Sequence, residues 1–204
     1  MTEFDLGFDP DAYDAVIYDL DGTLVRLTVD WNVVAEDVLA VYTEHAVKPP
    51  SDRLWDLLEA APEYGIADAV EAAIAAHEHD GARESRRLAV ADALSTDRAS
   101  RTGVCSLNAE EACRIALRAH GIDDRVSAIV GRDTIGTYKP DPEPLRATIE
   151  ALSADPKRSI FVGDSDRDAR TARRAGVEFA RVNPTAARHD GGDDGGDGGD
   201  GDDD

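Results

Sequence analysis

Two carboxylates, one residue apart, follow a short apolar stretch near the start of the chain. The segment AVIYDLDGTL covers residues 15–24, and its acidic positions are Asp19 and Asp21. Apolar and aromatic residues in an unbroken run, bounded by turn formers, are typical of a short strand that is buried on both faces. Burial disfavours the ionised form of a carboxyl group, so two charges at the end of such a strand call for a positive partner.

Further side chains that can do chemistry also follow predicted strands. They are Ser106, Lys139, Asp164 and Asp168. In an open parallel sheet the carboxyl ends of the strands share one edge, where ligands bind. We therefore expect these groups to lie together with the first two carboxylates, although they are far apart in the sequence.

Carboxylates gathered at one edge of a sheet would repel one another unless a cation neutralised them. The crowded set is Asp19, Asp21, Asp164 and Asp168. Mg²⁺ prefers oxygen ligands, takes one or two carboxylates directly and keeps waters that leave room for a phosphate oxygen. Together with one lysine and one hydroxyl, such a site suits phosphoryl transfer, where catalysis consists mainly of positioning and charge stabilisation.

The elements that position these residues alternate between strands and helices. Strands are predicted at 15–19, 103–106, 126–130, 159–162 and 177–182, with helices from Asn108 as N-cap to Gly121, at 142–152 and at 166–175. Helices of 10 to 14 residues between strands indicate βαβ units with right-handed crossovers. The expected fold class is α/β, with a Rossmann-like parallel sheet and helices on both faces.

A helical block interrupts this plan after the first strand. Apolar residues recur at helical spacing around Val34, Leu57, Ile74 and Leu88, which predicts four helices and no strand over 28–97. Asp30 is the expected N-cap of the first of them. The third is expected to end near His77 and His79, which we interpret as solvated residues. The block is therefore an insertion into the α/β plan.

The charge balance excludes several classes of partner. The chain has 43 acidic and 22 basic residues and a net charge of −21, which repels nucleic acids and anionic membranes. Abundant Asp and only three lysines are typical of a halophilic protein, although an ordinary acidic protein is the alternative. Residues 190–204 contain only Asp and Gly and are expected to be disordered.

The two cysteines do not indicate a disulfide framework or a zinc site. Cys105 and Cys113 lack further Cys or His residues in register and are expected to be buried apolar fillers. No signal peptide and no apolar run near 18 residues is present. We expect a soluble, cytoplasmic protein whose partner is a small-molecule phosphate ester.

The motifs and their order resemble the haloacid dehalogenase (HAD) superfamily of phosphohydrolases. Four segments carry the resemblance: DLDGT at 19–23, Ser106, Lys139 in YKPDPE, and GDSDRD at 163–168. A lysine at the third motif is notable in a chain that otherwise uses arginine, because a compact ammonium and a planar guanidinium are not interchangeable. One departure concerns the second motif. The family often has Asn directly after the Ser or Thr, whereas here Leu107 intervenes before Asn108.

The resemblance covers about 13–183 and implies a division of the chain. A catalytic core is expected at 13–27 and 98–183. The insertion at 28–97 is similar to the small helical cap of phosphoglycolate-phosphatase-like members. The tail at 190–204 lies outside both.

The resemblance also implies roles for individual residues. Asp19 would be the nucleophile that forms an aspartyl-phosphate, and Asp21 the acid for the leaving alcohol and then the base for water. Ser106 and Lys139 would hold the phosphoryl oxygens. The implied reaction is the hydrolysis of a small phosphorylated metabolite such as phosphoglycolate or a sugar phosphate.

For the metal, the resemblance implies Mg²⁺ bound by Asp19, Asp164 and the main-chain carbonyl of Asp21. Asp168 would support the metal or pair with Lys139. An EF-hand reading of 164–175 fails, because alanine stands at its sixth and twelfth positions.

Three other interpretations stay open at this point. Asp19 and Asp21 could be turn residues at the end of a strand. The enzyme could be a phosphomutase that passes the phosphoryl group to a second hydroxyl. The chain could also be an inactive acidic module that binds a partner.

Overall fold

The fold is built around a parallel sheet. The computed structural model describes residues 5–95, 97 and 101–183, so the predicted acidic tail at 190–204 lies outside the described residues. Among them, five strands form the sheet in the order β5-β4-β1-β6-β7, with every neighbouring pair parallel. The strands are β1 (Ala15–Tyr18), β4 (Thr102–Cys105), β5 (Ala128–Val130), β6 (Ser159–Gly163) and β7 (Glu178–Arg181).

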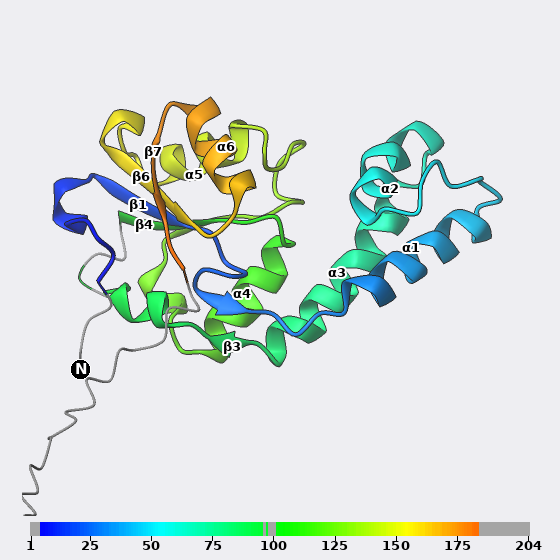
Figure 1. Cartoon of the computed structure of the whole chain (residues 1–204), viewed down its shortest axis with the longest axis horizontal. Helices are drawn as coiled ribbons and strands as arrows, with labels where there is room; N and C mark the ends of the chain where they lie inside the picture. The colour runs from blue at the N-terminus through cyan, green and yellow to red at the C-terminus, as the bar shows by residue number, and fades with distance from the viewer. Residues whose placement is uncertain (1–4, 96, 98–100, 184–204) are drawn as a thin grey trace, which may run out of the picture.

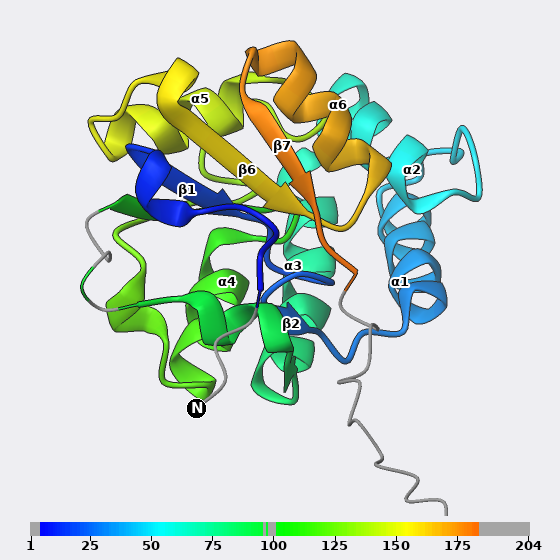
Figure 2. The ribbon, with the colours of Figure 1, turned by 60° about the vertical axis from the view of Figure 1, so that its left-hand side comes forward.

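Helices cover both faces of the sheet, which explains why β1 and β6 are buried along their whole length. Val16 and Tyr18 of β1 point to the face covered by α4 (Glu110–Ala119). Ile17 points to the opposite face, which is covered by α5 (Glu143–Ala151) and α6 (Asp166–Ala175). Figure 2 shows α5 and α6 on one side of the strands and α4 on the other. The expected α/β class with a Rossmann-like sheet and an inserted helical region is confirmed.

Local signals in the sequence set the ends of several helices. The side chain of Asp30 accepts a hydrogen bond from the Asn32 amide and so caps α1 (Trp31–Glu44), as predicted. Gly121 follows α4 with a φ of 60°, and Gly176 ends α6 with a φ of 74°, a conformation that glycine adopts without strain. Cys105 and Cys113 are buried and free, as expected.

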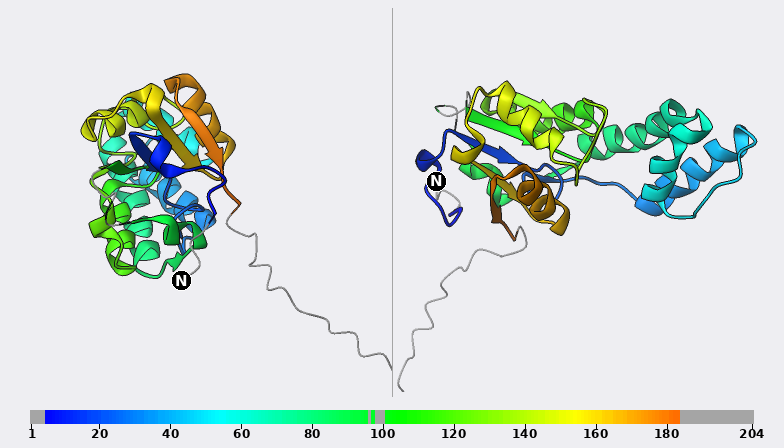
Figure 3. Two further views of the ribbon diagram at one scale, coloured as in Figure 1. Left: turned by 90° about the vertical axis from the view of Figure 1, so that its left-hand side faces the viewer. Right: turned by 90° about the horizontal axis from the view of Figure 1, so that it is seen from above.

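The inserted region packs around its own apolar cluster. It contains α1, α2 (Leu54–Ala60), the 3-10 helix η2 (Ala61–Tyr64) and α3 (Ala67–Arg83). Tyr42 lies at the centre of the cluster, and its hydroxyl donates to the Leu57 carbonyl at 2.6 Å. Figure 1 and the right-hand view of Figure 3 show this region projecting from the sheet. None of the described helices is long and apolar enough to cross a bilayer.

Helix α3 belongs to both parts of the molecule. Its first half carries Val70 and Ile74 into the cluster of the inserted region, whereas Ala82 near its end lies in the core beside the sheet. Its second half packs against α4. The helix therefore runs past His77 and His79 to Arg83, and the expected end near these histidines is wrong.

The predicted fourth helix of the insertion is also wrong. In its place the chain forms β3 (Arg86–Arg87), which pairs antiparallel with β2 (Val25–Arg26), followed by the 3-10 helix η3 (Ala89–Ala93). Val90 and Leu94 then pack in the cluster that contains β1 and α4. By packing, this end of the insertion belongs with the sheet. The remaining 3-10 helices are η1 (Pro10–Ala12), η5 (Asp123–Arg125) and η6 (Pro156–Arg158).

The start of α4 differs from the prediction as well. Asn108 was expected to cap this helix, but the helix begins at Glu110, and its N-cap, Ala109, offers no side-chain bond. The first amides of the helix are satisfied by carboxylates from elsewhere in the chain. Glu78 accepts from the Ala109 amide, and Asp133 accepts from the Glu110 amide. The Asn108 side chain instead lines the site described next.

Candidate active site

Lys139 holds two of the predicted carboxylates together at the carboxyl edge of the sheet. Its ammonium donates to Asp19 at 2.7 Å and to Asp168 at 2.6 Å. All three side chains are buried. The ammonium also lies 5.4 Å from the centre of the Phe161 ring, which forms an apolar floor. Residues more than a hundred positions apart therefore meet, as the strand-end argument predicts.

The turn after β1 places the first carboxylates against the fourth motif. The Asp19 amide donates to the Val162 carbonyl of β6, which extends the ladder by one residue. Gly22 has a φ of 85°, and a Cβ at this position would lie 2.2 Å from Oδ2 of Asp164. The close approach needs glycine, because any side chain would displace the Asp164 carboxylate.

The beginning of α6 fixes the orientation of Asp168. Ser165 is the N-cap and forms a reciprocal capping box with Asp168, in which each side chain bonds the other residue's amide. The second oxygen of Asp168 accepts from Lys139, so the carboxylate is held from two sides. Asp168 thus pairs with Lys139, one of the two roles that the resemblance implied for it.

The electrostatics of this cluster follow from burial and from an excess of negative charge. Burial, and then the charge of Asp168, raises the pKa of Asp19 to about 7 in spite of the nearby ammonium. Burial alone would lower the pKa of Lys139, but Asp19 and Asp168 outweigh it and the pKa is raised. Burial also raises the pKa of Asp164, with a further contribution from Asp168. One ammonium is too little positive charge for three carboxylates, of which Asp19 and Asp168 are buried and Asp164 is half-buried.

The oxygen atoms of the same carboxylates fit a divalent cation. Asp19, Asp164 and Asp168 each offer an oxygen, and these atoms lie within 4.8 Å of one another. A hard cation such as Mg²⁺ takes this type of donor and would supply the missing positive charge. The carboxylate of Asp21 is not part of this set, and its Oδ1 accepts from the Leu27 amide at 2.9 Å. Burial raises the pKa of Asp21 as well.

The second predicted motif reaches the cleft through the amide of Asn108, and the hydroxyl of Ser106 bonds that amide. Ser106 is buried, and its hydroxyl donates to the Asn108 side-chain oxygen at 3.1 Å. Asn108 and Leu107 line the cleft, whereas the predicted site residue Ser106 is not among its lining residues. The extra residue between Ser106 and Asn108 therefore still leaves the amide at the site.

A buried ion-pair network, which the sequence analysis did not identify, holds this amide. Glu78 of α3 is 0% exposed and accepts hydrogen bonds from the Asn108 side chain and the Ala109 amide, each at 3.0 Å. Arg132 donates to both Glu78 oxygens, at 2.7 and 2.9 Å, and to the Leu107 carbonyl at 2.9 Å. Arg132 also bonds Glu71, which lies two helical turns before Glu78. The network ties α3 of the insertion to the loop after β4.

The sequence contained one signal for this network. Glu78 follows Val70 and Ile74 at four-residue intervals, so it occupies the next position of an apolar helix face. A carboxylate on such a face is buried only when it is paired. The charged neighbours of Glu78 in the HEHD segment, residues 77–80, concealed this signal.

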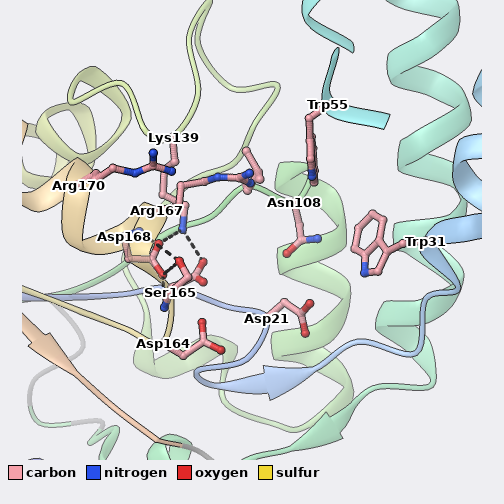
Figure 4. Close-up of a pocket in the computed structure, with 12 residues that line it drawn as sticks. Asp21, Trp31, Trp55, Asn108, Lys139, Asp164, Ser165, Arg167, Asp168 and Arg170 are labelled. Atoms are coloured by element: carbon pink, nitrogen blue, oxygen red, sulfur yellow. Dashed lines mark hydrogen bonds and ion pairs between the residues drawn. The ribbon is translucent and has the colours of Figure 1, made fainter. Parts of the chain in front are cut away.

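A cleft of about 420 Å³ lies over these groups, between the sheet edge and the inserted helices. Figure 4 shows Trp31 and Trp55 of the insertion facing Asn108 and Arg167 across it. Within the described part of the chain, its lining consists of Asp19, Asp21, Trp31, Trp55, Leu107, Asn108, Lys139, Asp164, Ser165, Arg167, Asp168 and Arg170. An acidic and lysine-bearing floor under an aromatic roof can bind a small anionic ester.

Comparison with known proteins identifies the family. A family model described as "Haloacid dehalogenase-like hydrolase" matches residues 16–182. The chain is 37% identical over 185 residues to a phosphoglycolate phosphatase of Rhodospirillum rubrum, covering 80% of this chain and 76% of the relative. It is 30% identical over 184 residues to a plasmid-encoded phosphoglycolate phosphatase of Cupriavidus necator, covering 82% and 80% of the two chains.

Solved structures share the fold at lower sequence identity. A predicted phosphoglycolate phosphatase from Haemophilus somnus superimposes with a TM-score of 0.57 at 21% identity, covering 82% of this chain and 84% of the other. CbbY of Rhodobacter sphaeroides, solved in complex with phosphate, gives a TM-score of 0.57 at 17% identity over 89% and 92% of the chains. Both similarities concern the fold alone.

Proposed function

This chain belongs to the haloacid dehalogenase-like hydrolases and is a phosphoric monoester hydrolase, and we propose that its substrate is phosphoglycolate, with sugar phosphates as the alternative. The observation that carries the proposal is the meeting of Lys139 with Asp19 and Asp168, next to Asp164. The two relatives reported above, which match most of this chain, support the choice of phosphoglycolate.

In the proposed reaction, Asp19 attacks the phosphorus atom of the ester. A bond forms between a carboxylate oxygen of Asp19 and phosphorus while the bond from phosphorus to the ester oxygen breaks. Lys139 orients Asp19 through Oδ1 and leaves Oδ2 available for the attack. Asp21 gives its proton to the departing alkoxide, a role that suits a carboxyl group whose pKa is raised by burial.

The second half of the proposed reaction returns the enzyme to its starting state. Asp21 takes a proton from a water molecule, and the resulting hydroxide attacks the phosphorus of the aspartyl-phosphate. The bond between phosphorus and the Asp19 oxygen breaks, and inorganic phosphate leaves. Each cycle thus consumes one water molecule and yields one alcohol and one phosphate.

The remaining residues bind and orient the phosphoryl group. Mg²⁺, held by Asp19, Asp164 and the main-chain carbonyl of Asp21, would neutralise the charge on the phosphoryl oxygens. Lys139 offers a third N–H to the same group. Asn108, held by Ser106 and Glu78, presents the second N–H of its amide to the cleft. The Trp31 and Trp55 side chains would exclude water from the closed site.

The test is phosphate release by the full-length protein from phosphoglycolate, glucose 6-phosphate and p-nitrophenyl phosphate, with Mg²⁺ in buffered molar KCl. We expect Asp19→Asn to abolish turnover of all three while the protein stays folded, and EDTA to remove the parent activity until Mg²⁺ is returned. Asp166→Asn is the matched control, because its side chain is 93% exposed and pairs with Arg181. Unchanged turnover in Asp19→Asn would refute the nucleophile.

The same assay separates hydrolysis from phosphomutase activity. Hydrolysis releases one equivalent of inorganic phosphate for each ester consumed and yields no isomerised sugar phosphate. A sugar phosphate isomer without free phosphate would favour the phosphomutase. A parent protein that prefers glucose 6-phosphate to phosphoglycolate would shift the proposed substrate to the sugar phosphates.

A further inference from the structure

Arg167 starts from a rigid position beside the catalytic carboxylates. It lies in the first turn of α6, directly before Asp168, whose capping box with Ser165 fixes the backbone there. The side chain is half-buried and lines the cleft together with Lys139 and Asp19. A cation thus faces the substrate cleft from a well-ordered part of the molecule.

The insertion holds the Arg167 side chain by an aromatic contact. The guanidinium carbon lies 5.0 Å from the ring centre of Trp55, and Trp31 lies beside Trp55 with ring centres 6.1 Å apart. Figure 4 shows the Arg167 side chain extending across the cleft towards Trp55. An arginine stacked on an aromatic face keeps the N–H groups of its edge available for a planar anion.

Arg167 differs from many other arginines of this acidic chain in its lack of a carboxylate partner. Arg132, Arg146 and Arg181 all bond carboxylates at 2.7 Å or less. For Arg167, no carboxylate of the described residues lies within the 4.0 Å that defines an ion pair. With 43 acidic residues available, a cation left unpaired in the cleft favours an acidic group that comes from outside the chain.

We propose that Arg167, stacked on Trp55, is the subsite that binds the carboxylate of the substrate. The inference rests on the proposed function, since it assumes that a phosphate ester binds at Asp19. Lys139 and the metal site serve the phosphoryl end of such an ester. A substrate that carries a second negative group, one or two carbon atoms from the ester oxygen, needs a second cation. The guanidinium edge supplies two parallel N–H donors that match a carboxylate.

The structure predicts which esters profit from Arg167. Phospho-acids such as phosphoglycolate and 3-phosphoglycerate would contact both ends of the cleft. Their counterparts without the carboxylate, ethyl phosphate and glycerol 3-phosphate, would contact only the phosphoryl end. A hydrogen bond to a charged group contributes enough that its loss corresponds to a roughly 10- to 100-fold change in kcat/KM.

The test compares these two pairs of esters by steady-state kinetics on the full-length protein with Mg²⁺. Arg167→Met keeps the apolar stem against Trp55 and removes the donors. We expect it to lower kcat/KM for the phospho-acid that the parent prefers by about 10- to 100-fold, mainly through KM, and to leave ethyl phosphate within about twofold. Arg167→Lys should recover part of the loss. Arg173→Met is the matched control, since Arg173 is exposed on the same helix and does not line the cleft.

The outcomes separate the role of Arg167 from the identity of the substrate. An equal loss on esters with and without a carboxylate, or no loss at all, would overturn the role of Arg167. A parent protein that prefers 3-phosphoglycerate and loses that preference in Arg167→Met would support Arg167 and overturn phosphoglycolate as the substrate. A parent without preference for either phospho-acid over its counterpart would overturn both.

Discussion

Glu78 provides the sharpest test of how the insertion supports the active site. All four groups that contact its carboxylate are donors: two N–H groups of Arg132, the Asn108 side chain and the Ala109 amide. In Glu78→Gln, the new NH₂ group must face at least one of them, and Arg132 loses the charge of its most buried partner. Removing one partner of a buried ion pair typically costs 3–5 kcal/mol, and we expect about 3 kcal/mol here, because Glu71 still bonds Arg132.

The matched control is Glu71→Gln, which removes the charge of the other carboxylate that bonds Arg132 and leaves the loop at 106–109 untouched. The Glu71 side chain is 27% exposed, so the amide of Glu71→Gln can turn its NH₂ to water while its oxygen still accepts from Arg132. We expect a loss of about 1 kcal/mol or less. Urea unfolding in molar KCl measures both values. A loss of about 3 kcal/mol corresponds to a fall in melting temperature of roughly 6–12 °C in a chain of this size.

Amide hydrogen exchange localises the effect. The Ala109 amide donates to Glu78 and should exchange faster in Glu78→Gln relative to amides of β1, while Glu71→Gln should leave it unchanged. The reasoning is refuted if Glu78→Gln is no less stable than Glu71→Gln. It is also refuted if the Ala109 amide exchanges equally in both variants.

Three further predictions follow from the site and the composition. Gly22→Ala should lower kcat at least tenfold, because its Cβ would lie 2.2 Å from the Asp164 carboxylate. Gly65→Ala, which has open space around it and a φ of 70°, should lose only stability, and equal kcat values in the two variants would contradict the prediction. Lys139→Arg should lower kcat for p-nitrophenyl phosphate more than about 100-fold, because a guanidinium cannot replace a buried ammonium between two carboxylates. A kcat within tenfold of the parent value would refute this prediction. The melting temperature should rise from low salt to molar KCl, since salt screens the self-repulsion of a chain with net charge −21. A fall in melting temperature would rule out the halophilic interpretation.

The sequence was sufficient to locate the first carboxylates of the candidate site because a topological rule places them. Parallel strands end at the same edge of a sheet, so any polar residue directly after a buried strand lies there. Asp19 and Asp164 each follow such a strand, and β1 and β6 are neighbours in the sheet. The approach of Asp19 to Asp164 required no knowledge of side-chain packing.

The region around Leu88 shows why the last part of the insertion was predicted wrongly. Leu88, Ala91 and Leu94 recur every three residues, which the sequence analysis took as part of a helical block. A strict three-residue period is the repeat of a 3-10 helix, and η3 at Ala89–Ala93 has that form. The apolar face was identified correctly, but it packs on the sheet and not on the inserted helices.

The network of Glu78 could not be located by a rule of this kind. Glu78 and Arg132 are 54 residues apart, and they meet only because α3 leaves the insertion and packs beside the sheet. The loop at 106–109 has no regular secondary structure to fix it, and Glu78 supplies two of its hydrogen bonds. The insertion therefore builds one wall of the active site in addition to covering it, because its longest helix carries both the apolar contacts of its own cluster and the carboxylate that holds Asn108 in place.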